Sequence, residues 1–301
     1  LNTAGIPTVK KLLVIICSAV LIAINGCSDN NNTSTRKPSV TVFTAPAAAI
    51  VRAVAGEHFN VTVIVPPGKD AHEYEPTSGD IAAIQRGGAY FSLGSQPELR
   101  LANTIANFGG LLFHMDENVP RRMPDGGESG DQHGENSDPH LWMSPENCII
   151  MAGNCAGFLA EIQPENRDSF YANCDRFIRQ LNEINENLKQ RFEPYRKRKF
   201  YVFHPAFGYF ADAFGIQQCA IESGGKTPTP RELEITLADA AKDGVKTLYA
   251  SEEFNMDMQN AAANFLNCRL VILNPLPEDP AANFTVMADA IIEGFLLEDE
   301  L

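Results

Sequence analysis

The chain has 301 residues, of which 44% are apolar, and it carries a net charge of −14 from 24 basic and 38 acidic side chains. The apolar content excludes an intrinsically disordered chain, and the length is sufficient for two ordinary hydrophobic cores. The acidic balance argues against a nucleic-acid partner, which would require a basic surface.

The N-terminus has the pattern of an export signal. Two lysines precede an apolar run at residues 12–24, which is long enough for the core of a signal peptide but too short for an ordinary membrane span. The run leads into Cys27, and the sequence at this point resembles the cleavage box of a bacterial lipoprotein. We expect residues 1–27 to form a lipoprotein signal peptide with lipidation at Cys27, and residues 28–38 to form a polar tether. An ordinary secretory peptide is the alternative, and either signal exports the protein.

Export changes what the cysteines after the tether are able to do. None of them forms a C-x-x-C pair, which argues against a thiolate zinc site. Two of them, Cys155 and Cys174, fall on helices on either side of a predicted turn and are able to face each other. A disulfide between these two and a set of small buried thiols both remain open. The cysteines concerned are Cys148, Cys155, Cys174, Cys219 and Cys268.

The first half of the chain alternates strands and helices. Hydrophobic patterns predict strands at residues 40–43, 60–65, 89–93 and 111–115, and helices at residues 45–55, 79–86 and 98–107. A Pro-Pro-Gly turn follows the second strand and delivers His72 at its carboxyl end. Ligands of parallel α/β sheets normally bind at this end of the strands.

Residues 116–138 interrupt the alternation with a run of Gly, Asp, Glu and Ser. A loop of this length inside a compact domain is usually either functional or a solvated insertion. The functional interpretation is a mobile acidic arm that samples metal ions, with His133 as a weak ligand. The solvated insertion is the interpretation that we favour.

The segment from Ser137 to Pro145 stands at the centre of the chain and contains its single tryptophan. Two prolines and Asp138 place His140 on a short, stiff turn just before a helix. A histidine held in this way is already aimed before any ligand arrives.

Two helices follow, at residues 145–162 and 164–194. The second has apolar residues at steps of three and four along one stripe, and about 28 helical residues would span about 42 Å, longer than one small domain needs. We therefore expect an N-terminal α/β lobe at residues 39–163, a linking helix at residues 164–195 and a C-terminal α/β lobe at residues 196–301.

The second half repeats the pattern of the first. Predicted strands lie at residues 200–203, 218–221, 247–250 and 269–273, and predicted helices at residues 208–214, 231–242, 256–266 and 282–297. His204, Glu252, Glu253 and Asn274 fall at the carboxyl ends of these strands. The sequence predicts an α/β fold with two similar lobes, mainly parallel sheets and one long rigid helix between them.

His72, His140 and His204 share a setting, because each has a neighbouring proline or acid and each ends a strand or opens a helix. No local spacing motif connects them, so this shared context carries the hypothesis. Three imidazoles suit Zn²⁺ and leave a fourth tetrahedral position open. We expect these three histidines to meet at one metal ion.

The segments around these histidines also resemble a known family. They read PGKDAHEYEP at residues 67–76, DPHLWMSP at residues 138–145 and HPAFGYF at residues 204–210. They resemble the signature segments of the zinc-binding group of cluster A-I solute-binding proteins, the metal receptors of ABC transporters. The resemblance covers nearly the whole chain after the tether. It implies two α/β lobes on one backbone helix, with the metal in the cleft between them and the three histidines as ligands.

The chain departs from this family in its expected fourth ligand. Asn274 stands where the family often has an aspartate, and manganese-binding relatives place a carboxylate where this chain has His204. Three imidazoles with few anionic oxygens favour Zn²⁺ over Mn²⁺. The fourth position is then left to water, to Asn274 as a weak ligand, or to Glu252 or Glu253.

We therefore expect an extracytoplasmic, non-enzymatic receptor that captures Zn²⁺, with Mn²⁺ less favoured, and delivers it to the permease of an ABC transporter. It would be a monomer, either anchored to the membrane as a lipoprotein or periplasmic. The alternatives are a zinc hydrolase or hydratase that uses the same histidines with Glu252 or Glu253 as base, a manganese-binding relative, and an adhesin with an incidental metal site.

Overall fold

The structure is a computed structural model that describes residues 37–123, 137–222 and 228–299. The expected signal peptide with Cys27, most of the tether, and His133 of the acidic segment lie outside the described residues.

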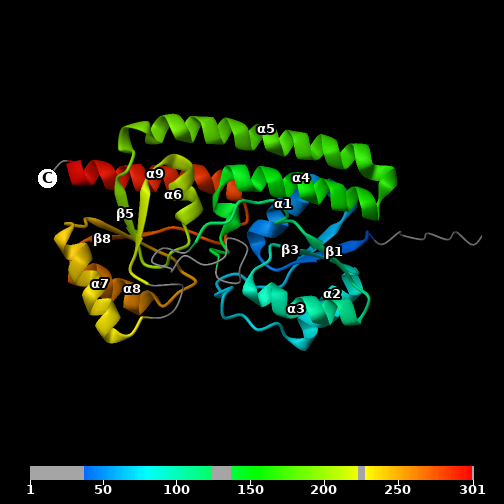
Figure 1. The fold of residues 1–301 in the computed structure, drawn as a ribbon, viewed down its shortest axis with the longest axis horizontal. Coiled ribbons are helices and arrows are strands. Elements are labelled where there is room, and N and C mark those ends of the chain that lie inside the picture. The colour runs from blue at the N-terminus through cyan, green and yellow to red at the C-terminus, as the bar shows by residue number, and fades with distance from the viewer. Residues whose placement is uncertain (1–36, 124–136, 223–227, 300–301) are drawn as a thin grey trace, which may run out of the picture. The chain divides into compact units, whose positions relative to one another are not determined.

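Two four-stranded parallel sheets form the framework, and Figure 1 shows them in separate halves of the described chain. The first sheet, in the order β2-β1-β3-β4, consists of β1 (Ser39–Val42), β2 (Asn60–Val63), β3 (Ala89–Ser92) and β4 (Leu111–His114). The second, in the order β6-β5-β7-β8, consists of β5 (Lys199–Val202), β6 (Gln217–Ala220), β7 (Thr247–Ala250) and β8 (Arg269–Ile272). The two halves therefore repeat one strand order, and all their pairings are parallel.

Helices connect the strands and cover the sheets. They are α1 (Ala45–Ala55), α2 (Ser78–Gly87), α3 (Gln96–Asn107), α4 (Pro145–Ile162), α5 (Arg167–Phe192), α6 (Gly208–Phe214), α7 (Pro230–Lys242), α8 (Met256–Leu266) and α9 (Pro280–Asp299). Short 3-10 helices accompany them at η1 (Gly56–His58), η2 (Leu141–Met143), η3 (Pro164–Asn166) and η4 (Glu193–Tyr195). Proline near the start of α1, α3, α4 and α7 suits these helix beginnings, since the first helical position needs no N–H donor.

Each sheet is buried on both faces, as parallel sheets usually are. Successive side chains of a strand point to opposite faces, so Phe91 of β3 joins the core under α1 and α4, and its neighbour Tyr90 joins a second cluster under α2 and α3. In β7, Tyr249 and Leu248 divide in the same way between the core under α9 and a cluster under α7 and α8. One hydrophobic core thus continues through both halves, and each half adds a smaller cluster on its other face.

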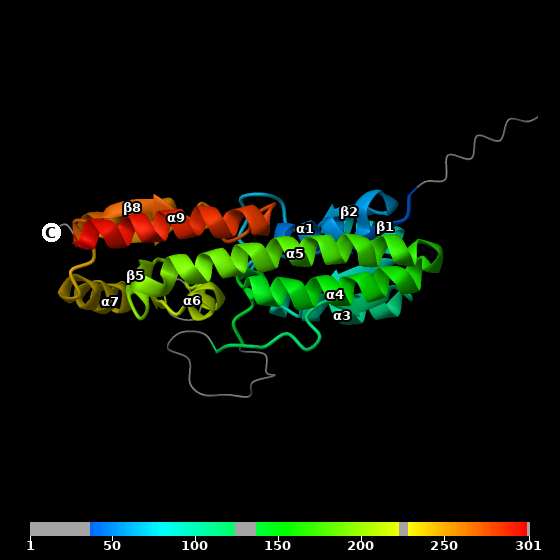
Figure 2. The same ribbon diagram turned by 90° about the horizontal axis from the view of Figure 1, so that it is seen from above.

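Helix α5 is the element that belongs to both halves. It packs against α1 and α4 along its first half and against α6 and α9 along its second half, as Figure 2 shows from above. Its two ends and its middle are all buried in the shared core, through Phe170, Phe192 and Leu181 respectively. The expected linking helix is thus observed as η3, α5 and η4 in succession, and its apolar stripe faces the core as predicted.

The predicted elements are confirmed with small shifts at their ends. Helices α1, α4, α6 and α8 and strand β7 have the predicted bounds, whereas β2 ends two residues earlier, at Val63. The last helix begins at Pro280, two residues before its predicted start. The lobe boundaries stay predictions.

Two further features bear on the sequence expectations. The disulfide considered between Cys155 and Cys174 is not formed, and both are buried thiols. Burial, and to a smaller extent the nearby Cys174, raises the pKa of Cys155, so the two thiols lie close to each other on α4 and α5. Helix α9 is long and apolar enough to pass as a membrane span, but Phe284 and Ile291 are buried in the core, as in the core helix of a globular domain.

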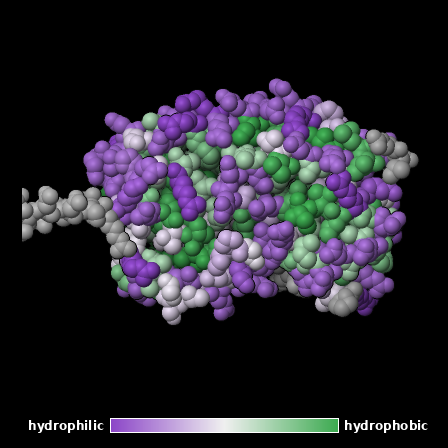
Figure 3. All heavy atoms as spheres, turned by 180° about the vertical axis from the view of Figure 1, so that it is seen from behind, coloured by the Kyte–Doolittle hydropathy of each residue, from purple (hydrophilic) through white to green (hydrophobic). Residues whose placement is uncertain are grey.

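Figure 3 shows one face of the molecule with hydrophilic side chains over much of it and hydrophobic ones between them.

Candidate metal centre

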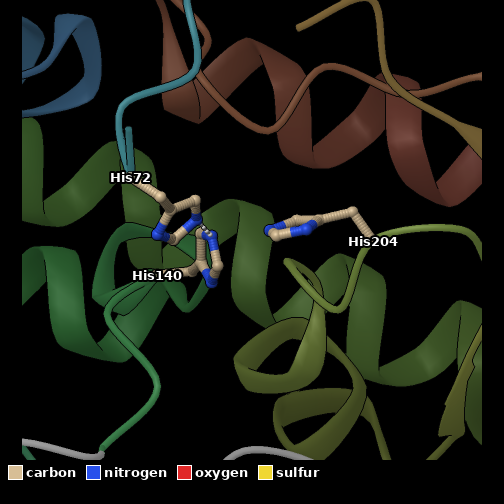
Figure 4. Close-up of side chains that lie close together, drawn as sticks. All are labelled: His72, His140 and His204. Atoms are coloured by element: carbon tan, nitrogen blue, oxygen red, sulfur yellow. Dashed lines mark hydrogen bonds between the residues drawn. The ribbon is translucent and has the colours of Figure 1, made fainter. Parts of the chain in front are cut away.

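Three histidines from distant parts of the chain converge on one point, as Figure 4 shows. His72 comes from the segment between β2 and α2, His140 immediately precedes η2, and His204 follows β5. One ring nitrogen of each lies within 4.8 Å of the others, and the ring centroids are 5.1 to 5.4 Å apart. The structure therefore brings together the three histidines that the sequence singled out.

His140 is held by a buried carboxylate two residues before it. Asp138 Oδ1 accepts hydrogen bonds from the backbone N–H of His140 at 3.0 Å and from its Nδ1 at 2.8 Å. Since Nδ1 carries the proton in this arrangement, Nε2 presents its lone pair to the other histidines. The short turn around Pro139 thus fixes both the ring orientation and the tautomer.

His204 is held by a carboxylate that the sequence reasoning did not single out. Its Nδ1 lies 2.8 Å from Oε2 of Glu222, and its ring stacks on Phe254 with centroids 4.0 Å apart. Its Nε2 is buried and has no hydrogen-bond partner among the described residues. A buried acceptor nitrogen without a partner is costly unless a ligand satisfies it. Glu222 follows β6 by two residues, so the same strand-end rule that pointed to His204 also marks this position.

His72 completes the group from the loop after the Pro-Pro-Gly turn. Asp70 Oδ1 accepts its backbone N–H at 2.7 Å, and its Nε2 faces Nε2 of His140 at 3.2 Å. Burial and the neighbouring His140 lower the pKa of His72 to about 3. The pKa of His204 also lies well below its ordinary value, mainly because the ring is buried and to a smaller extent because the two other histidines are close. Both imidazoles are therefore neutral near pH 7, which is the state that binds a metal.

Acidic side chains surround the histidines. Burial followed by the nearby Asp70 and Glu73 raises the pKa of Glu222 to about 7. Burial also raises the pKa of Asp70, with Glu73 adding to the shift. Carboxylates that repel one another in this way are stabilised by a cation, so the electrostatics of the group favour a divalent ion.

The geometry fits a tetrahedral ion with modest closure. Zn–N bonds of about 2.0–2.1 Å place two ligand nitrogens about 3.3 Å apart. The His72–His140 pair already meets this distance, at 3.2 Å, and the ring of His204 has to approach by no more than about 1.5 Å. Neutral imidazole nitrogens are donors that suit Zn²⁺, Cu²⁺ or Ni²⁺ better than Mg²⁺ or Ca²⁺.

The residues considered for the fourth position differ in their surroundings. Asn274 is exposed, and its Oδ1 accepts the N–H of Leu276 at 2.8 Å, so its side chain takes part in the turn after β8. Glu252 is exposed as well. Glu253 is half-buried, and its Oε2 has no hydrogen-bond partner among the residues that the structure describes. Burial followed by Glu252 and Asp70 raises the pKa of Glu253.

Comparison with known proteins shows the family of this chain. The family model for ZnuA, the zinc-uptake complex component A, periplasmic, matches residues 40–294. The chain belongs to this family. A crystal structure of ZnuA superposes on it with a TM-score of 0.79 and 28% identity, covering 86% of this chain and 99% of that one.

Curated relatives extend the family match. The zinc-binding lipoprotein AdcA of Streptococcus pneumoniae is 24% identical over 282 residues, which cover 89% of this chain and 55% of AdcA. A metal ABC transporter substrate-binding lipoprotein of Lactococcus lactis is 28% identical over 221 residues, which cover 70% of each chain. The chain thus spans about half the length of AdcA.

Proposed function

We propose that this chain is an extracytoplasmic receptor that captures Zn²⁺ and delivers it to the permease of an ABC transporter. The observation that carries the proposal is the convergence of His72, His140 and His204, together with the buried Nε2 of His204, which has no hydrogen-bond partner in the described part of the chain. Membership of a family of zinc-uptake components and the names of the two relatives support the same role. Anchoring through a lipid on Cys27 and a monomeric state are part of the proposal.

The ligand set is proposed as His72, His140 and His204 with one further position. Glu253 is our first choice for that position, because it is half-buried and its Oε2 is without a partner among the described residues. Water is the second choice, and Asn274 remains as a weak one. Three nitrogen donors favour Zn²⁺ over Mn²⁺, which prefers carboxylate and water oxygens.

The architecture suggests how the ion is held. His72 and His140 come from the half that contains the first sheet, and His204 comes from the half that contains the second. An ion bound by all three ties the halves together, while the continuous core along α5 limits their relative movement. Release would then depend on local movement of the loops that carry the histidines and on contact with the permease.

The test measures the zinc content and zinc affinity of the purified protein and of His72→Ala, His140→Ala and His204→Ala. His114→Ala is the matched control, since His114 is a half-exposed histidine at the end of β4 outside the group. Zinc at 100 times Kd should stabilise the parent and the control by about 2.7 kcal/mol. Each of the other three variants should lose most of this effect. If added zinc does not raise the melting temperature of the parent, the receptor proposal is refuted.

The hydrolase alternative makes a different prediction for the same proteins. A zinc enzyme would hydrolyse an activated ester or hydrate CO₂, with turnover abolished in His140→Ala and in Glu253→Gln. The receptor proposal predicts zinc binding without turnover above free zinc. Turnover that depends on His140 would replace the receptor by an enzyme.

A further inference from the structure

Arg122 connects the two halves of the chain next to the metal centre. It follows β4, and its Nη1 donates to Oδ2 of Asp138 at 2.8 Å. Its Nε donates to Oδ2 of Asp212 on α6 at 2.9 Å. Helix α6 begins four residues after His204, so one guanidinium bridges the segment that holds His140 and the helix that follows His204.

Asp138 shares its carboxylate between the two partners. Oδ1 holds the ring and the backbone of His140, whereas Oδ2 accepts from Arg122, and the side chain is only 2% exposed. The backbone adds two contacts to the same link. Tyr209 of α6 donates its hydroxyl to the carbonyl of Asp138 at 3.0 Å and accepts the backbone N–H of Arg122 at 3.1 Å. The orientation of His140 is therefore tied to α6 by several bonds in series.

Gly208, the first residue of α6, makes room for this link. A Cβ placed on it would overlap the guanidinium of Arg122. Its φ does not lie in the left-handed region, so the backbone conformation itself would accept alanine. The glycine is thus required by the close approach of Arg122 and not by the conformation of the chain.

We propose that Arg122 is a positioning residue of the metal centre, which sets the direction of the His140 ring relative to His204 by joining Asp138 to helix α6. This inference rests on the proposed metal binding. Arg122 itself does not contact the ion, and it acts only through the carboxylate that holds His140. Lysine cannot replace it fully, because a single ammonium lacks the planar fork that reaches two carboxylates at once.

The test combines three variants that disturb the link from different sides. Arg122→Gln removes the charge, Arg122→Lys keeps the charge without the fork, and Gly208→Ala displaces the guanidinium without changing it. Gly153→Ala is the matched control, because Gly153 is an exposed helical glycine of α4, and beyond its own helix backbone and chain neighbours no atom of the described residues lies within 4 Å of an added Cβ. Zinc affinity is measured by calorimetry, and Co²⁺ absorption reports the geometry of the ligands.

Outer-shell partners of ligating histidines typically contribute 10–100-fold to metal affinity, so Arg122→Gln and Gly208→Ala should weaken zinc binding by about 10–100-fold and shift the Co²⁺ bands. Arg122→Lys should recover part of the zinc affinity and part of the parental Co²⁺ spectrum, and Gly153→Ala should match the parent in both measurements. If Arg122→Gln does not fold, Gly208→Ala and Arg122→Lys decide the question.

The outcomes separate this inference from the proposed function. The positioning role alone would be overturned if the parent binds zinc and if Gly208→Ala and Arg122→Lys bind it with an affinity within twofold of the parent. Both variants would then also give the Co²⁺ spectrum of the parent. A parent that binds no zinc would overturn the receptor proposal together with the inference that rests on it.

Discussion

Glu222→Gln tests whether the carboxylate beside His204 acts on the metal centre through its charge. Glutamine keeps the length of the side chain, and its carbonyl oxygen is able to accept the hydrogen bond from Nδ1 that Glu222 accepts at 2.8 Å. The substitution therefore preserves the ring orientation and removes the negative charge. The measurement is zinc affinity by calorimetry at pH 8 and at pH 6, with Glu146→Gln on the exposed start of α4 as control.

The expected size of the effect follows from the position of Glu222 and its pKa. A carboxylate behind a ligating histidine typically contributes 10–100-fold to metal affinity, which is about 1.4–2.7 kcal/mol. Burial raises the pKa of Glu222 to about 7, so in the metal-free protein about nine-tenths of it is ionised at pH 8 and about one-tenth at pH 6.

The zinc affinity depends on pH because zinc binding is linked to the protonation of Glu222. Zinc favours the ionised carboxylate, so below pH 7 binding has to displace a proton from Glu222, and the affinity of the parent falls by roughly tenfold between pH 8 and pH 6. Glu222→Gln lacks this contribution, and other titrating groups are common to both proteins. The ratio of the two affinities should therefore be 10–100 at pH 8 and about tenfold smaller at pH 6. An equal ratio at both pH values, or a ratio near one at pH 8, would refute the reasoning.

Three further predictions concern the stability of the metal-free protein, measured by urea unfolding. Asp138→Asn should reduce the free energy of unfolding by about 1.5–3 kcal/mol, because the buried carboxylate of Asp138 loses its charge-assisted hydrogen bonds with Arg122 and His140. Arg122 keeps its second partner, Asp212, and a loss below about 1 kcal/mol would contradict the link. Leu181→Ala should cost about 2–5 kcal/mol, because this fully buried residue of α5 belongs to the core shared by both halves. Its control is Glu183→Ala, at an exposed position two residues further along α5, which should change the free energy of unfolding by no more than about 0.5 kcal/mol. Equal effects of Leu181→Ala and Glu183→Ala would argue against the predicted apolar stripe. Trp142→Phe should reduce the free energy of unfolding by about 1–3 kcal/mol, because the carbonyl of Pro275 loses the hydrogen bond that the indole N–H donates at 2.7 Å. The zinc affinity should stay within a few-fold of that of the parent, and a large loss would show that the indole takes part in the site.

Much of the fold was readable from the chain because its local signals agree with one another. Proline and capping residues mark the helix starts, and short apolar runs mark the strands, as expected for sheets that are buried on both faces. The apolar stripe of α5, with Phe170, Leu181 and Phe192 on one side, predicted its buried face, and the length of the helix indicated that it links two lobes. Strand ends were less well predicted, as at Val63, because the β-branched Ile64 and Val65 beyond it continue the pattern and still donate their backbone N–H groups to Val42 and Phe43.

The sequence by itself singled out the three histidines that the structure brings together, and the stiff turn that presents His140. It did so because proline, glycine and Asp138 act within a few residues of each histidine, where local geometry dominates. Only the tertiary structure decided which side chains hold and surround those histidines. Glu222 meets His204 across 18 residues and Arg122 meets Asp212 across 90, and neither pairing leaves a periodic trace in the chain. Such contacts depend on how two sheets and α6 pack, and packing is a property of the whole core that no single segment encodes.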